Sequence, residues 1–206
     1  LHNRCRRQRQ MCIRDSMDSA LQNEAISLLG EQSGSVVMMD VNSGEVLTIA
    51  SAPTFNPNQF TVGLSQKEWD GLLDDQRKPL INKAIAGQYA PGSTVKMLIA
   101  IAGLEEKVIT PEEKIVCEGQ YELGGDTFHC WEHEGHGPMN MHDAITNSCD
   151  VYFYELARRL GIDPIERVAK KFGLGRPSIP GAFEEKKGLI PGRDWKRANL
   201  DAAWHV

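Results

Sequence analysis

The sequence lacks both a long apolar run and an excess of basic residues. A helix that crosses a bilayer needs about 20 predominantly apolar residues, and no stretch of the 206 residues approaches this. Lys and Arg number 23 against 28 Asp and Glu, a net charge of -5, and no basic stripe is interleaved with aromatics. We therefore expect no nucleic-acid partner, and we expect any membrane anchor to lie outside this chain.

Cysteines are few, and the part of the chain after residue 16 has an odd number of them, which does not suit a disulfide framework. Cys5 and Cys12 fall in the segment 1–16, which leaves Cys117, Cys130 and Cys149. Three cysteines make a metal site or a free thiol worth considering.

Residues 1–16 differ from the rest of the chain. They contain five arginines, no helical or strand period, and no apolar centre of the kind that signal peptides have. A basic arm for nucleic acid or acidic lipid is one interpretation. A non-native or disordered segment is the interpretation we favour, so fold reasoning is confined to residues 17–206.

The composition fits one globular domain, since 41% of the chain is hydrophobic and 25% is charged. The order of the expected strands and helices predicts the α+β class. Two strands joined by a tight turn are expected first, then helices, an irregular glycine-rich insert at 115–140, and further helices. The expected strands are 35–39 and 46–50, the expected loops are 51–60 and 173–206, and the expected helices are 18–30, 67–73, 93–105, 140–160 with an interruption near 147–148, and 163–172.

A serine and a lysine occur three residues apart at the start of a strongly apolar helix, as Ser93-Thr94-Val95-Lys96. At this spacing the two side chains share one helix face. Serine is a poor nucleophile until a base takes its proton, and burial can make a lysine that base because it disfavours the ammonium form. The helix N-terminus and the Ser93 N–H would stabilise an oxyanion. A capping serine followed by a solvated lysine is the alternative.

The surrounding residues resemble the class B penicillin-binding proteins. Residues 87–96 (GQYAPGSTVK) are similar to the active-site turn of that family, and Asn147-Ser148-Cys149-Asp150 is similar to its second motif in an S-x-D form. The resemblance extends over residues 19–206 and is greatest to the elongation-specific enzymes of rod-shaped bacteria. Further matching segments are 52–58, 135–137, 152–157, 160–163 and 188–191.

The resemblance implies a penicillin-binding transpeptidase and serine β-lactamase-like fold, with 17–206 as the N-terminal part of the domain. It implies that Ser93 forms an acyl-enzyme with the D-Ala-D-Ala end of a peptidoglycan stem peptide, which a second stem peptide resolves into a cross-link. Lys96 would be the base, Ser148 would relay a proton, and Asp150 would hold the polar network. Capping of the helix after Asp150 is the structural alternative for Ser148 and Asp150.

The family's third motif, K-T-G, does not follow Asp150. We therefore expect a chain that is truncated before the strands that carry this motif, and that is inactive or nearly so as given. The resemblance further implies β-lactams as inhibitors, a membrane glycosyltransferase of the elongation machinery as partner, and a protein anchored in the inner membrane with its catalytic domain in the periplasm.

Three cysteines and one histidine form a C-x12-C-x5-H-x12-C pattern, made by Cys117, Cys130, His136 and Cys149. Three thiolates and an imidazole suit a closed tetrahedral zinc site, which would staple the irregular insert. The alternative is a Cys117–Cys130 disulfide with Cys149 as a small buried apolar residue. Catalysis needs no cofactor, and His129, His133 and His142 are expected to be solvated.

Two other functions compete with transpeptidation. A class D-like serine β-lactamase would share the S-x-x-K motif but would deacylate with water; the 115–140 insert and the S-x-D motif argue against it. A β-lactam sensor domain would be acylated without turnover.

Overall fold

The computed structural model describes residues 16–179 and 184–199, which form two compact units. Unit 1 comprises residues 16–89 and the described part of 177–187, and unit 2 comprises 90–176 and 188–199. The α+β class is confirmed. Residues 1–15 of the segment 1–16, which was interpreted as non-native or disordered, lie outside the described residues.

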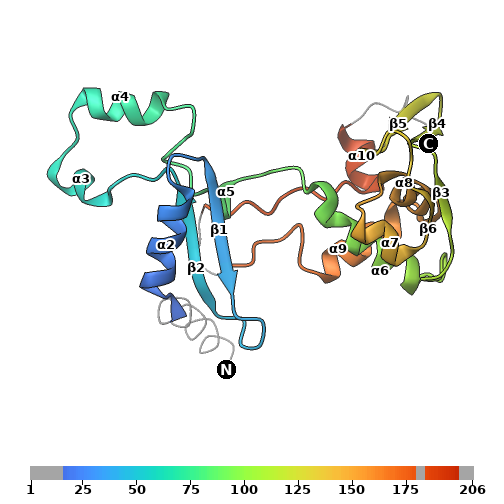
Figure 1. Cartoon of the computed structure of the whole chain (residues 1–206). Helices are drawn as coiled ribbons and strands as arrows, with labels where there is room; N and C mark the ends of the chain where they lie inside the picture. Colours follow the sequence, from blue (N-terminus) through green and yellow to red (C-terminus); the bar gives the residue numbers. More distant parts are fainter. Residues whose placement is uncertain (1–15, 180–183, 200–206) are drawn as a thin grey trace. The chain divides into compact units, whose positions relative to one another are not determined.

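Unit 1 is built on an antiparallel hairpin covered by one helix (Figure 1). Strands β1 (Gly34–Met39) and β2 (Val46–Ala52) pair with a register shift at Met38/Met39, and the turn between them contains Gly44 at φ 76°. Helix α2 (Ser19–Leu29) begins at Asp18, whose carboxylate accepts the N–H groups of Ala20 and Leu21. The strands and this helix were predicted.

The segment after β2 was predicted to be a loop and is partly helical. Helix α3 (Pro57–Val62) begins there because Asn56 caps it and Pro57 occupies its first turn. Helix α4 (Gln66–Asp74) matches the prediction and starts with a Ser65–Glu68 capping box. The short helix α5 (Lys83–Ala86) completes the unit.

Unit 2 is a group of helices packed with two small sheets (Figure 1). Its helices are η1 (Gly92–Val95, a 3-10 turn), α6 (Lys96–Glu105), α7 (Met141–Thr146), α8 (Asp150–Leu160), α9 (Ile162–Lys171) and α10 (Arg193–Asn199). Helix α10 lies in a region predicted to be loop. The break between α7 and α8 occurs at 147–149, where it was predicted.

The insert at 115–140 was predicted to be irregular, and this was wrong. It forms two antiparallel pairs, β3 (Ile115–Cys117) with β6 (Gly137–Met139), and β4 (Gln120–Leu123) with β5 (Asp126–His129). Each strand has only three or four residues, too short for a local alternation to reveal it. These strands are recognisable only from their pairing with each other in the folded chain.

The core of unit 2 lies between α6, α8 and the insert. Tyr152 and Leu156 of α8 are fully buried, and Phe153 is 3% exposed. Gly103 of α6 allows close packing, because a Cβ there would lie 3.0 Å from Leu156 Cδ1. All three cysteines of this unit belong to the same core.

Candidate active site and metal centre

Ser93 lies in the 3-10 turn that opens α6. Gly92 precedes it with φ 54°, a conformation that costs an L-residue about 1–2 kcal/mol, so glycine suits this turn. The Lys96 N–H donates to the Ser93 carbonyl oxygen, which closes the turn. Ser93 is exposed, whereas Lys96 is only 8% exposed. The turn therefore presents a hydroxyl at the surface beside a buried amine.

The Lys96 Nζ donates three hydrogen bonds, all to the turn between α7 and α8. The acceptors are Ser148 O at 2.7 Å, Ser148 Oγ at 3.0 Å and Asp150 Oδ1 at 2.7 Å. An ammonium has three N–H donors, so all of them are used. The Phe153 ring centroid lies 5.8 Å from Nζ and covers it on another side.

The Ser148 hydroxyl connects Lys96 to Ser93, with its Oγ 2.7 Å from Ser93 Oγ. The sequence predicted a serine and a lysine that face each other directly, whereas among the described residues Ser148 stands between them. Lys96 Nζ also lies 2.7 Å from the Asp150 carboxylate. The four predicted catalytic residues thus form one hydrogen-bonded network. Ser148 and Asp150 contact Lys96, and Ser93 contacts Ser148 at the exposed end of the network.

Ser148 has an unusual backbone conformation with φ 51°. Such a conformation costs a residue other than glycine on the order of 1–3 kcal/mol and persists only where surrounding contacts impose it. Here the N–H groups of Ser148 and Cys149 donate to carbonyls of α7, those of Ile145 and Ala144. The strained backbone directs both oxygen atoms of Ser148 at Lys96. Cys149 rather than Ser148 or Asp150 occupies the N-cap of α8, and its side chain makes no capping bond.

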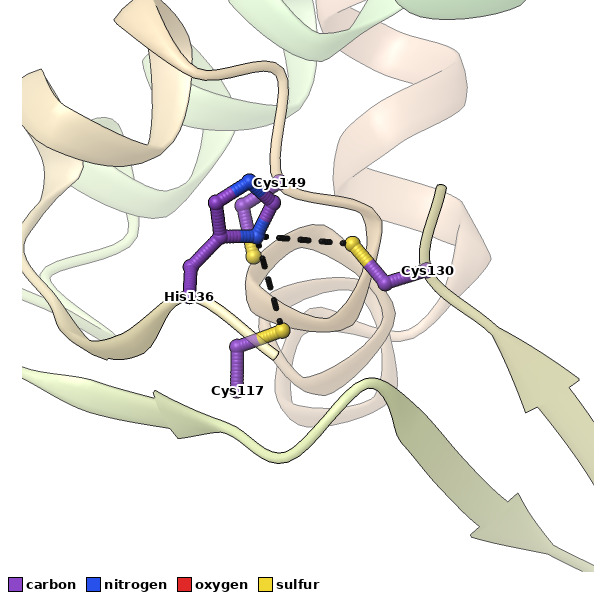
Figure 2. Close-up of side chains that lie close together, drawn as sticks. All are labelled: Cys117, Cys130, His136 and Cys149. Carbon is purple, nitrogen blue, oxygen red and sulfur yellow. Dashed lines mark hydrogen bonds between the residues drawn. The ribbon is translucent and has the colours of Figure 1, made fainter. Parts of the chain in front are cut away.

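The four predicted metal ligands lie together (Figure 2). Cys117 ends β3, Cys130 follows β5, His136 precedes β6, and Cys149 precedes α8. Their four ligand atoms lie within 4.8 Å of one another, and His136 Nδ1 is 3.7 Å from Cys117 Sγ and 3.6 Å from Cys130 Sγ. Ligands bound tetrahedrally to zinc would be separated by about 3.5–3.8 Å. The residues therefore fit a metal ion.

Burial and local hydrogen bonds shift the pKa values of two of these cysteines in opposite directions. The three cysteines are at most 2% exposed and are free thiols. Burial raises the pKa of Cys149 to about 12, whereas at Cys130 the N–H donors of Glu132, Asp150 and Val151 outweigh burial and lower the pKa. His129, His133 and His142 are exposed and lie outside the cluster, as predicted.

Two glycines allow the insert to close around the cluster. A Cβ on Gly119 would lie 2.1 Å from the His133 carbonyl oxygen, and a Cβ on Gly135 would lie 2.3 Å from the Cys117 carbonyl oxygen. Both glycines have positive φ, 84° and 81°. The backbone segments that carry the ligands can therefore approach each other only with glycine at these positions.

Trp131 was missed from the sequence, although it follows the predicted ligand Cys130 directly. Its backbone N–H donates to Asp150 Oδ2 at 3.2 Å, and its indole Nε1–H donates to Asn147 O at 3.0 Å. Its ring packs edge-on against His136, with centroids 5.1 Å apart. Trp131 thus touches both the metal cluster and the catalytic turn.

A second polar network on α8 was also missed. Glu155 accepts from Tyr121 Oη at 2.6 Å, from Arg158 Nε at 2.9 Å and from Arg159 Nε at 2.7 Å. The hydrogen bonds from Arg158, followed by those from Tyr121 and Arg159, outweigh burial and lower the pKa of Glu155 to about 2. This network ties β4 to α8.

Comparison with known proteins places the chain in a family. The penicillin binding protein transpeptidase domain matches residues 34–204, and the chain belongs to this family. It is similar to the peptidoglycan D,D-transpeptidase MrdA of Acinetobacter baumannii, with 38% identity over 92% of the chain and 28% of the relative. The expected transpeptidase fold is confirmed, and the domain is of the penicillin-binding protein 2 and MrdA type.

Solved structures of penicillin-binding protein 2 support the same family assignment. Penicillin-binding protein 2 of Pseudomonas aeruginosa, in complex with WCK 5153, is 37% identical with a TM-score of 0.85 over 92% of this chain and 44% of that one. The Helicobacter pylori protein, in a complex with MreC, is 33% identical with a TM-score of 0.84 over 92% and 36%. The chain thus spans less than half of these relatives. No helix of the described residues is long and apolar enough to span a membrane.

Proposed function

We propose that this chain carries the nucleophile of a peptidoglycan D,D-transpeptidase that cross-links stem peptides during cell elongation. The hydrogen-bonded path Lys96–Ser148–Ser93 supports this more than any other observation. It joins an exposed hydroxyl to a buried amine through hydrogen bonds, and a serine nucleophile needs a base within such reach.

The contacts suggest a route for the proton. Lys96 must lose a proton before it can accept one, and Asp150 Oδ1 at 2.7 Å is the adjacent acceptor. With both hydroxyls rotated, Ser93 Oγ–H donates to Ser148 and Ser148 donates to the neutral Lys96 Nζ. Ser93 Oγ then attacks the carbonyl carbon of the D-Ala-D-Ala bond, and the same path returns the proton to the leaving amine.

Substrates and partners follow from the relatives. Stem peptides ending in D-Ala-D-Ala would be acyl donors, and β-lactams would acylate Ser93 in their place. A glycosyltransferase of the elongation machinery and a protein similar to MreC are the proposed partners, since the Helicobacter relative forms a complex with MreC. The proposed location is the inner membrane, with this domain in the periplasm.

We further propose that Cys117, Cys130, His136 and Cys149 hold a structural zinc ion. Zinc would join the insert to the N-terminus of α8 and would take no part in the chemistry. Elemental analysis should find about one zinc per chain, and Cys130→Ser should remove it. His133→Ala, at an exposed histidine outside the cluster, should not. Zinc that persists in Cys130→Ser would contradict the proposed ligand set. A Cys117–Cys130 disulfide in the native protein would contradict the zinc site itself.

Labelling with a fluorescent penicillin tests the proposed function. The protein at its natural length should form one covalent adduct, which mass spectrometry should locate on Ser93. Ser93→Ala should abolish labelling, whereas Ser27→Ala, at an exposed serine of α2, should leave it unchanged. Equal labelling of Ser93→Ala would refute the assignment.

The fate of the adduct separates the alternatives. A transpeptidase should release D-Ala from a stem peptide and form a cross-linked product. Rapid hydrolysis of the penicillin adduct without cross-linking would indicate a β-lactamase instead. A stable adduct with no turnover of stem peptide would indicate a sensor domain.

A further inference from the structure

The turn between α7 and α8 is attached at two points to the cysteine cluster and at two points to Trp131, which follows Cys130. Cys149, within the turn, is one of the cluster's own ligand residues. The Asp150 N–H donates to Cys130 Sγ at 3.4 Å, the Trp131 N–H donates to Asp150 Oδ2, and the Trp131 indole donates to Asn147 O. Cys130 and Trp131 are adjacent in the chain, so one short segment holds both ends of the turn.

The same turn supplies every hydrogen-bond acceptor of Lys96, namely both oxygens of Ser148 and one of Asp150. These bonds are 2.7–3.0 Å long, within the range of about 2.7–3.2 Å that N–H···O hydrogen bonds in proteins occupy. A shift of the turn by about 1 Å would therefore break the path from Lys96 to Ser93, and displacements of this size can cost about 100-fold in rate.

The segment that holds the turn is joined to regular structure through short strands. It lies beyond β5, in an insert of two-stranded sheets with three or four residues per strand. Isolated two-stranded ladders are at best marginally stable in water. The Tyr121–Glu155 hydrogen bond also holds the insert on α8, and the cluster adds a second attachment directly at Cys130, next to Trp131.

We propose that Trp131 and the loaded cysteine cluster position the Asn147–Asp150 turn, and that metal loading thereby sets the rate of Ser93 acylation. The inference rests on the proposed function, because acylation is the step it governs. Trp131 is a positioning residue, since it touches Asn147 and Asp150 and not Ser93. Its side chain is 58% exposed, so its truncation removes a hydrogen bond without opening a cavity in the core.

A time course of labelling with fluorescent penicillin tests this, using the zinc-loaded protein at its natural length. Trp131→Phe removes the indole N–H and keeps an aromatic ring beside His136. The labelling rate constant should fall about fivefold, as expected for one neutral hydrogen bond, while the final extent of labelling and the zinc content stay unchanged. Trp69→Phe, the same change at a tryptophan of α4, should leave the rate unchanged.

Removal of zinc with a chelator should lower the rate constant by about tenfold or more, and added zinc should restore it. A purely structural role would instead lower the final extent of labelling and leave the rate constant of the remaining protein unchanged, and that result would overturn the inference. An unchanged rate in Trp131→Phe would also overturn it. Failure of the zinc-loaded wild type to label would refute the proposed function itself.

A spectroscopic measurement tests the same coupling from the metal side. In the cobalt-loaded protein, thiolate-to-cobalt absorption should shift when a penicillin acylates Ser93, because the adduct replaces the Ser93 hydroxyl that contacts Ser148, and the next residue of that turn is the ligand Cys149. The shift should be absent in Ser93→Ala and smaller in Trp131→Phe. An identical spectrum before and after complete acylation would contradict the proposal.

Discussion

The two units differ in what their interiors contain. Among the described residues of unit 1, those that are buried are small or polar: Ala25, Thr48, Ala50, Ala52, Pro79 and Lys83. Unit 2 buries Tyr152, Phe153 and Leu156 together with three cysteines and several branched residues. Conversely, Val37, Met39 and Val62 of unit 1 are more than half exposed. The catalytic and metal residues lie in the unit that has a large core.

This difference matters because a site needs rigid support. Side chains in a close-packed interior transmit small displacements, whereas a hairpin covered by one helix has few contacts that could hold a catalytic geometry. We therefore expect substitutions in unit 2 to affect both stability and the site, and equivalent substitutions in unit 1 to act locally. Hydrogen exchange measured segment by segment can follow the two units separately.

The largest effect is expected from Leu156→Ala. Leu156 is fully buried between α6 and α8, so its loss should destabilise unit 2 by about 3–5 kcal/mol through lost burial and a cavity. Exchange should accelerate throughout α6 and α8. Leu28→Ala on α2, where the side chain is 76% exposed, should change stability by less than about 0.5 kcal/mol. Similar effects at both positions would remove the contrast between the units.

Gly135→Ala should cost about 2–3 kcal/mol and weaken zinc binding, because the new Cβ would meet the Cys117 carbonyl oxygen at 2.3 Å. Gly125→Ala is the matched control. It also has positive φ, 92°, but nothing lies within 4 Å of its Cβ position. Gly125→Ala should lose only the stability that backbone strain costs. Its zinc affinity, measured by metal titration, should match that of the wild type. Equal zinc affinity in both variants would contradict close approach at Gly135.

Acid should destabilise unit 2 through Glu155. Its pKa is about 2 in the folded chain against a usual value of 4.5, so the stabilisation is present above pH 4.5 and is lost as pH falls toward 2. The expected loss is on the order of 2 kcal/mol, since the partner arginines are partly exposed. Chemical denaturation across this range should show a flatter pH dependence for Glu155→Gln. Glu24→Gln, at an exposed position of α2, should retain the wild-type dependence.

The smallest expected effect is in unit 1 and has the opposite sign. The Thr48 hydroxyl is buried in β2 and has no hydrogen-bond partner among the described residues. Thr48→Val should therefore stabilise the hairpin by about 1 kcal/mol, because it removes an unsatisfied polar group of similar shape. Thr127→Val, on exposed strand β5, should have almost no effect on stability in the same denaturation assay. Destabilisation by Thr48→Val would indicate that the hydroxyl has a partner.

Local patterns predicted most of the helices and the hairpin, because caps and turns act over a few residues. Asp18 and Gly44 are examples at α2 and at the β1–β2 turn. Helix α3 was missed although Asn56 and Pro57 are helix-start residues, because prolines nearby suggested a loop.

The candidate site was predicted in its members but not in its connections. Ser93 and Lys96 are neighbours on one turn, so their spacing alone brings them close. The bonds from Lys96 to Ser148 and Asp150 span more than 50 residues, and sequence reasoning treated them as separate roles. Trp131 was missed because its partners, Asn147 and Asp150, lie 16 and 19 residues further along the chain, and no local pattern reveals contacts over that separation.

Residue types and spacings predicted a nucleophile, an amine, a second motif and a set of metal ligands, because each of these predictions rests on the chemistry of the side chains themselves. Only the tertiary structure decided that the cluster and the catalytic turn share the Cys130–Trp131 segment. The reason is that β3 pairs with β6 across about 20 residues of sequence, and Gly119 and Gly135 let the intervening backbone close up. Together these contacts bring the Cys130–Trp131 segment beside the N-terminus of α8.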